Sequence, residues 1–204
     1  CYFLDILQEI DPTLNLYATE HETGKERVIS KGHNYIEGEF FPKTDIKFDL
    51  IIFTEAIEHI NDVSEFLESA YELLRPGGLI YITTPNFSSL ERLIMGSKWG
   101  MVTPPEHLSY FTVSTLNKSM NRSKFQKIYS LTENISIFRI MEFFNAHMRS
   151  PTLNQSSNIS PQQVSDRLQQ ASSNNFFLGI AKGFINFILL KLHWGSSLKA
   201  LYKK

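Results

Sequence analysis

The sequence contains one cysteine, Cys1, among its 204 residues, so an internal disulfide is excluded. It shows no charged segment followed by an apolar stretch and a cleavage site of the kind that directs secretion. These two absences favour a reducing, cytoplasmic setting. Neither basic nor acidic residues are in clear excess: 20 basic and 21 acidic residues leave a formal net charge of -1. Such a chain has no overall field that attracts nucleic acid, and we expect no nucleic-acid partner.

A hydrophobic content of 42% in a chain of this length is sufficient for one core and small for two. We therefore predict a single domain over residues 1–204. Within it, residues 145–175 are rich in polar side chains and are predicted to form an insertion or lid. Residues 176–194 are strongly apolar and predict a helix that packs on the domain or makes peripheral contact with a membrane. Lys182 and Lys191 interrupt this helix and disfavour spanning.

Hydrophobic spacing and turn residues indicate alternating helices and strands. The expected elements are helices at 3–10, 23–31, 62–74 and 112–121, and strands at 14–19, 34–39, 48–53, 79–84, 127–132 and 198–202. The nearly continuous apolar run 48–53 predicts a central strand that is buried on both faces, and 198–202 is expected as an antiparallel edge strand. The order predicts an α/β fold with a doubly wound, mostly parallel sheet. Ligands of such sheets bind at the carboxyl ends of the strands.

Two segments carry a resemblance to a known family. Residues 48–60 read FDLIIFTEAIEHI and residues 74–80 read LRPGGLI, and their order and spacing resemble the central motifs of class I S-adenosylmethionine-dependent methyltransferases. Residues 105–112, PEHLSYFT, resemble the stretch before a later helix, and residues 195–201 more weakly resemble the last strand. The resemblance implies a Rossmann-like fold, S-adenosylmethionine as cofactor, and methylation of a small-molecule hydroxyl on a glycan, lipid-linked sugar or quinone-like compound.

The family's first strand and glycine-rich loop have no counterpart in this sequence, and Cys1 would follow directly after them. The resemblance therefore implies an N-terminally truncated domain. That loop holds the methionine part of the cofactor through close approach of its backbone. We accordingly expect the 204-residue chain to bind S-adenosylmethionine weakly or not at all.

The resemblance also implies which residues bind the cofactor. The expected set is Tyr2, Glu20, His21, Glu39, Phe40, Thr54 and Glu55. Glu20 matches the acidic residue that accepts hydrogen bonds from both ribose hydroxyls, a task that suits the two oxygens of a carboxylate. Glu39 and Phe40 are expected near the adenine. The alternatives are an exposed turn acid at Glu20, a solvated loop acid at Glu39, and a core residue at Phe40.

The expected catalytic residues are Glu58, His59 and His107. On a helical turn, Glu55 shares a face with Glu58 or His59, an arrangement that suits a divalent metal or a general base. The Glu-x-x-Glu-His spacing resembles quinone-type O-methyltransferases, in which these positions are tied to metal. The alternatives are a Glu-His pair that only fixes the loop, and a His107 that only marks the entry to the helix near Thr112.

Two other functions remain open from the sequence. One is a methyltransferase-fold protein that binds partners without catalysis. The other is a nicotinamide-dependent oxidoreductase, since Glu20 would also suit the ribose of that cofactor. The expected antiparallel last strand argues against the oxidoreductase, and the strand order decides between them.

Overall fold

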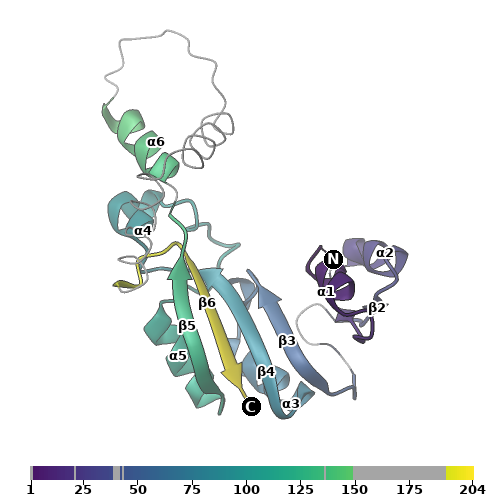
Figure 1. Ribbon diagram of the computed structural model, residues 1–204. Helices are drawn as coiled ribbons and strands as arrows, with labels where there is room; N and C mark the ends of the chain where they lie inside the picture. Colours follow the sequence, from purple (N-terminus) through teal and green to yellow (C-terminus); the bar gives the residue numbers. More distant parts are fainter. Residues whose placement is uncertain (1, 21, 39–41, 43, 136, 149–191) are drawn as a thin grey trace, which may run out of the picture.

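A computed structural model describes residues 2–20, 22–38, 42, 44–135, 137–148 and 192–204 (Figure 1). The predicted polar insertion and apolar helix therefore lie largely outside the described residues. Among the described helices, none has both the length and the apolar character needed to cross a membrane.

The described residues up to Tyr35 form a small unit of their own. It consists of α1 (Tyr2–Ile10), β1 (Tyr17–Ala18), α2 (Glu22–Ser30) and β2 (Asn34–Tyr35), with β1 and β2 paired in parallel. Asp5 links α1 to the end of α2, because its carboxylate pairs with Lys31 and lies 2.8 Å from His33 Nε2. The unit lies beside β3 (Figure 1), and the Tyr17 ring meets the ring of Phe48 edge to face at 5.7 Å.

The main sheet of the described residues has the strand order β3-β4-β6-β5. Its strands are β3 (Phe48–Thr54), β4 (Leu74–Pro85), β5 (Gln126–Glu133) and β6 (Ser197–Lys203). β3 and β4 pair in parallel, and β6 is antiparallel to both β4 and β5. Three strands thus share one direction, and the expected mostly parallel sheet with an antiparallel last strand is confirmed.

Two expectations about position within this sheet are wrong. Residues 48–53 form an edge strand of the described sheet instead of a central one, and Leu50 is 43% exposed. Residues 198–202 lie between β4 and β5 instead of at an edge. A run of apolar residues indicates only how much of a strand's side-chain surface is buried. Whether the strand lies at the edge or in the middle of a sheet depends on which other segments form backbone hydrogen bonds with it, and the run carries no information on that. The burial of Leu198, Ala200 and Tyr202, every second residue of β6, shows that one face of this strand packs in the core.

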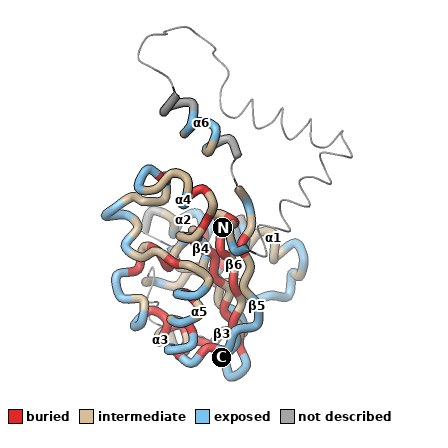
Figure 2. The backbone as a smooth tube through the Cα atoms, turned by 90° about the vertical axis from the view of Figure 1, so that its left-hand side faces the viewer, coloured by how far each residue is buried: buried red, intermediate tan, exposed pale blue. Residues whose placement is uncertain are grey.

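Two helices cover one face of the sheet and complete the core. α3 (Val63–Leu73) begins at Asp62, whose carboxylate accepts hydrogen bonds from the backbone of Ser64 and Glu65. α5 (Val113–Arg122) begins at Thr112, which forms a capping box with Thr115. The core cluster joins the inward faces of these helices to alternate residues of β4 and β6. Figure 2 shows the buried positions concentrated there.

The carboxyl ends of β3 and β4 lie side by side, since Thr54 pairs with Thr83. The elements at this end of the molecule are η1 (Ile57–His59), α4 (Leu90–Met95), η2 (Gly96–Lys98) and α6 (Ile137–Met148). α4 contacts α6, a helix that the sequence analysis did not predict. A bridge between Asn86 and Phe111 brings the segment after β4 beside the segment that leads into α5. The rim where we expect a ligand is therefore built from these loops.

Candidate functional site

The loop after β3 turns sharply at Glu55, which adopts a left-handed backbone with φ of 50°. The turn is held by β4: the Glu55 backbone N–H donates to the Thr83 carbonyl at 3.0 Å, and the Thr83 hydroxyl donates to Glu55 Oε1 at 2.9 Å. The fully buried Ile57 then anchors η1 in the core. This anchor fixes the direction in which the next two side chains, Glu58 and His59, leave the backbone.

Glu58 is an acidic side chain in the interior, only 2% exposed. Its Oε2 accepts a hydrogen bond of 2.9 Å from the Thr84 hydroxyl on β4. Burial is the main cause that raises the pKa of this carboxyl above its ordinary value of 4.5, and the Thr84 hydrogen bond only partly opposes it. The backbone carbonyl of Glu58 also accepts from the N–H groups of Leu108 and Ser109, at 2.8 and 3.0 Å. Glu58 therefore joins η1 to the loop that carries His107.

Within the described part of the chain, His59 and His107 each have one ring nitrogen, Nε2, without a hydrogen-bond partner. Nδ1 of His59 donates to the carbonyl of Glu106 at 2.9 Å, and Nδ1 of His107 donates to the carbonyl of Met101 at 2.7 Å. A carbonyl only accepts, so each Nδ1 carries a proton and each neutral ring keeps its lone pair on Nε2. The two rings meet edge to face, with centroids 4.8 Å apart. Both histidines are thereby oriented as bases or as metal ligands.

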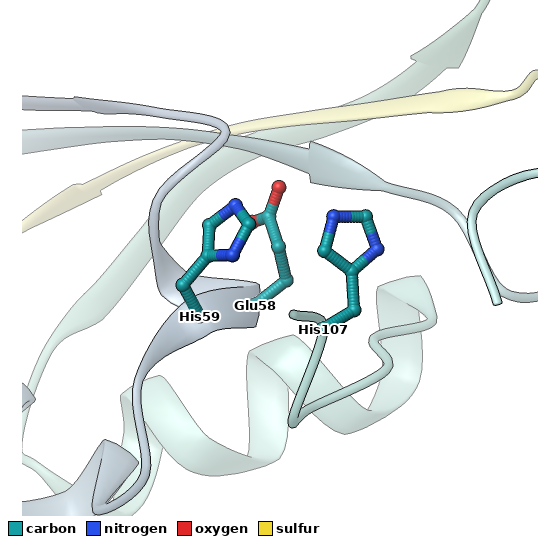
Figure 3. A group of neighbouring side chains, drawn as sticks. All are labelled: Glu58, His59 and His107. Atoms are coloured by element: carbon teal, nitrogen blue, oxygen red, sulfur yellow. The ribbon is translucent and has the colours of Figure 1, made fainter. Parts of the chain in front are cut away.

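Glu58, His59 and His107 form one cluster, which we call the candidate catalytic cluster. Each offers a ligand atom, and these atoms all lie within 4.8 Å of one another. Figure 3 shows the three side chains gathered below the ends of the strands. The expected set of catalytic residues is thus brought together by two segments, η1 and the loop that carries His107. One detail differs from expectation, because Glu55 is not a member of this cluster and its carboxylate is engaged by Thr83 instead.

The expected cofactor residues are placed only in part. Glu20 follows β1, Thr54 is the last residue of β3, and Glu55 comes directly after it; all three are exposed. At Gly24, an added Cβ would lie 3.0 Å from Glu20 Oε2, so the glycine leaves room for this carboxylate. The side chains of the other members of the set lie outside the described residues; these are Tyr2, His21, Glu39 and Phe40.

A row of four aromatic side chains, called the aromatic wall below, extends from the candidate catalytic cluster. It comprises His107, Tyr110, Phe87 and Trp99, with centroid distances along the row of 6.5, 5.1 and 6.3 Å. The backbone N–H of Phe87 donates to the Phe111 carbonyl at 2.7 Å, which fixes Phe87 beside Tyr110. Sequence reasoning named Tyr110 near His107 but missed Phe87 and Thr84. Their position at and just beyond the carboxyl end of β4 was the signal that would have found them.

Glu58 predicts a pH dependence of stability. Because its pKa is raised in the folded state, its contribution to the free energy of unfolding is fully present below about pH 4.5 and is lost as pH rises through the raised pKa. The Glu58→Gln variant has a neutral side chain at every pH. As pH rises above about 4.5, we therefore expect its free energy of unfolding to fall less than that of the wild type. The measurement is urea unfolding at a series of pH values with a chelator present. Exposed Glu68 on α3 supplies the control, Glu68→Gln. Parallel pH curves for wild type and Glu58→Gln would contradict the prediction.

The fold and the rim define a Rossmann-like α/β protein with an acid and histidine cluster at the carboxyl ends of its strands. Residues 3–130 match a family model described as a methyltransferase domain. The chain belongs to this methyltransferase family.

Curated relatives match parts of the chain. Over 90 residues it is 29% identical to the mitochondrial ubiquinone biosynthesis O-methyltransferase of Rattus norvegicus, covering 42% of this chain and 26% of that protein. Over 122 residues it is 28% identical to the ubiquinone biosynthesis O-methyltransferase of Rhodopseudomonas palustris, covering 56% of this chain and 47% of that protein. The chain therefore spans less than half the length of these two relatives.

Solved structures share the fold at low sequence identity. A methyltransferase of Archaeoglobus fulgidus aligns with a TM-score of 0.58 at 14% identity, covering 99% of this chain and 80% of that one. A methyltransferase of Mesorhizobium loti aligns with a TM-score of 0.57 at 14% identity, covering all of this chain and 86% of that one. Both are described as S-adenosylmethionine dependent. The expected class I methyltransferase fold is confirmed, and the antiparallel β6 argues against the oxidoreductase alternative.

Proposed function

We propose that this protein transfers a methyl group from S-adenosylmethionine to a hydroxyl group of a small molecule, and that the candidate catalytic cluster receives that hydroxyl. The observation that carries the proposal is the orientation of His59 and His107. Their Nδ1 atoms are held by backbone carbonyls, so both Nε2 lone pairs are left for a proton at the rim of the sheet. Membership of the methyltransferase family supplies the class of reaction.

The rim offers groups that suit the cofactor. Glu20 is an exposed carboxylate after β1, and its two oxygens fit the two hydroxyls of a ribose. Thr54 and Glu55 lie at the end of β3, where ligands of such sheets bind. When bound, S-adenosylmethionine supplies a methyl carbon made electrophilic by the neighbouring sulfonium. The protein's task is then to align the acceptor oxygen with that carbon and to take its proton.

The proton transfer follows from the geometry. Nε2 of His59 or His107 accepts the proton of the acceptor hydroxyl while the oxygen–carbon bond forms and the sulfur–carbon bond breaks. S-adenosylhomocysteine and the methylated acceptor are the products. Glu58 favours the protonated imidazole when it is ionised, because a carboxylate stabilises a neighbouring cation. Its hydrogen bond to Thr84 fixes the side chain for that purpose.

A divalent cation is the second candidate for the same cluster, and the close approach of the three ligand atoms favours it. One carboxylate and two neutral imidazoles are suitable ligands for a first-row transition metal. Glu58, His59 and His107 would hold the ion, and when bound it would lower the pKa of an acceptor hydroxyl. The relatives described as ubiquinone biosynthesis O-methyltransferases favour a phenolic, quinone-type acceptor over a glycan or lipid-linked sugar.

Turnover tests the proposal and separates the two roles of the cluster. We expect S-adenosylhomocysteine to form when the full chain is given S-adenosylmethionine and a catechol, and to form more slowly or not at all with matched sugars. If a cation participates, prior EDTA treatment abolishes turnover and added Zn²⁺ or Mn²⁺ restores it. Turnover that is unchanged by EDTA assigns the cluster to proton transfer alone. Absence of product even at S-adenosylmethionine concentrations high enough to offset weak binding would favour the non-catalytic alternative.

A further inference from the structure

Arg92 is a cation without an ionic partner among the described residues. It lies in the last turn of α4, and its guanidinium carbon is 4.5 Å from the centroid of the Phe87 ring. Its Nε is buried and has no hydrogen-bond partner in the described part of the chain. Buried polar atoms are nearly always paired, so an unpaired guanidinium nitrogen calls for an explanation.

The acid next to Arg92 in the sequence does not neutralise it. Glu91 is fully buried and engages other groups: Trp99 Nε1 donates to its Oε2 at 3.4 Å, and Arg139 of α6 lies 3.6 Å from the same oxygen. Within the described residues, Arg92 appears in none of the ion pairs. The contact that stabilises the Arg92 charge among the described residues is therefore the face of the Phe87 ring. This contact orients the guanidinium group but accepts no hydrogen bond from its N–H groups.

Phe87 places Arg92 on the aromatic wall that leads to the candidate catalytic cluster. The Phe87 ring lies 5.1 Å from Tyr110, and Tyr110 lies 6.5 Å from His107, measured between centroids. Phe87 and Tyr110 are only half-buried, so part of each ring stays accessible. The ring planes are inclined to one another, by 45° between Phe87 and Tyr110 and by 71° between Tyr110 and His107. An acceptor that lies along this row would have one end at the histidines and the other at Arg92.

The chemistry of guanidinium identifies the group that would bind there. Arginine is always charged, and its planar fork of donors matches the two oxygens of a carboxylate or phosphate. We propose that Arg92 is a specificity-determining residue that binds an anionic group, a carboxylate or a phosphate, on the acceptor whose hydroxyl meets His59 and His107. The position of the hydroxyl rests on the proposed function, whereas the anion site rests on Arg92 and Phe87 alone.

Binding of small aromatic anions to the full chain tests this site without turnover. The probes are benzoate and phenyl phosphate, with benzamide as the neutral match, in calorimetry and in ¹⁵N NMR of the arginine Nε–H groups. We expect one anion to shift the Arg92 signal and to bind better than benzamide. Arg92→Gln should weaken that binding about tenfold or more, because a charge-assisted pair is lost. Stronger binding of benzoate assigns a carboxylate, and stronger binding of phenyl phosphate assigns a phosphate.

Matched variants separate anion binding from structure. Arg122→Gln removes an exposed arginine of α5 and should leave affinity unchanged. Arg92→Lys keeps the charge without the planar fork and should bind less tightly than the wild type. Arg92→Met keeps the apolar contact with Phe87 and should retain the melting temperature while losing the anion. Equal affinity in wild type and Arg92→Gln, or equal binding of benzoate and benzamide, would overturn the proposal.

Kinetics link the anion site to the reaction. With 3,4-dihydroxybenzoate, Arg92→Gln should raise KM about tenfold with little change in kcat, since the lost contact exists in both ground and transition states. The neutral methyl ester of the same compound should show no such change. Arg92-dependent anion binding in a protein without turnover would support the site and contradict only the proposed function. A KM for dihydroxybenzoate that is unaffected by the substitution would overturn the assignment to the acceptor.

Discussion

Replacing His59 with Asn should lower kcat by roughly 10²- to 10⁴-fold, the usual contribution of a positioned general base. Asn can still place an amide N–H near the Glu106 carbonyl, which Nδ1 of His59 contacts at 2.9 Å, but it has no counterpart of Nε2. The variant therefore removes the base while keeping the hydrogen bond that holds the loop. We expect its affinity for S-adenosylmethionine to stay close to that of the wild type, because His59 is not among the residues that we expect to bind the cofactor.

The measurement is initial-rate kinetics of S-adenosylhomocysteine formation, together with calorimetry of cofactor binding. His107→Asn should behave alike, since Nδ1 of His107 is held by Met101 in the same manner. His193→Asn is the matched control: His193 is exposed, and its left-handed backbone, with φ of 53°, is one that Asn tolerates. Wild-type turnover in both cluster variants would show that neither imidazole takes the proton. A loss shared by His193→Asn would show a general effect on the fold.

Gly195→Ala should destabilise the fold by about 3 kcal/mol, an effect at the upper end for an overpacked interior. A Cβ at this position would lie 2.4 Å from the backbone nitrogen of Glu133 and 2.6 Å from the carbonyl carbon of Thr132. These neighbours are backbone atoms of β5, so no side chain can move aside to relieve the overlap. The beginning of β6 and the end of β5 would have to separate.

The same substitution should disturb the rim. The Gly195 carbonyl accepts a 2.7 Å hydrogen bond from the fully buried Asn86 side chain, which leads into the segment with Phe87. Urea unfolding measures the loss of stability. Gly100→Ala is the control, because a Cβ at Gly100 would have nothing within 4 Å, and it should be nearly neutral. Equal stability of the two variants would contradict the close packing of β5 against Gly195.

Local elements could be predicted because their signals are short in range. The Asp62 cap and the apolar spacing of Phe66, Leu67 and Ala70 predict α3, and both features are present in the structure. Thr112 marks the start of α5 in the same way. Helix α6 was missed because its apolar residues adjoin a long polar stretch, although Ser136, a residue type favoured at helix N-caps, directly precedes it.

The members of the candidate catalytic cluster were named from the sequence, but their geometry was not predicted. The sequence suggested that Glu55 shares a helical face with Glu58 and His59, a reading based on i, i+3 and i+4 spacing. The left-handed turn at Glu55 breaks that spacing, and hydrogen bonds from Thr83 direct its carboxylate elsewhere. His107 occupies the third place in the cluster because the backbone of Leu108 and Ser109 is bound to the carbonyl of Glu58.

The sequence by itself determined the class of fold, the residues that form most helices and strands, and the identity of the acid and the two histidines. These depend on periodicity, caps and motif spacing, which act over a few residues. The tertiary structure alone decided that β3 lies at an edge, that β6 lies between β4 and β5, and that His107 replaces Glu55 beside Glu58. It also decided that Arg92 stands over Phe87 without a carboxylate among the described residues. Such features arise from pairing and packing between segments far apart in the chain, and the free energy of those contacts is not encoded in any local pattern.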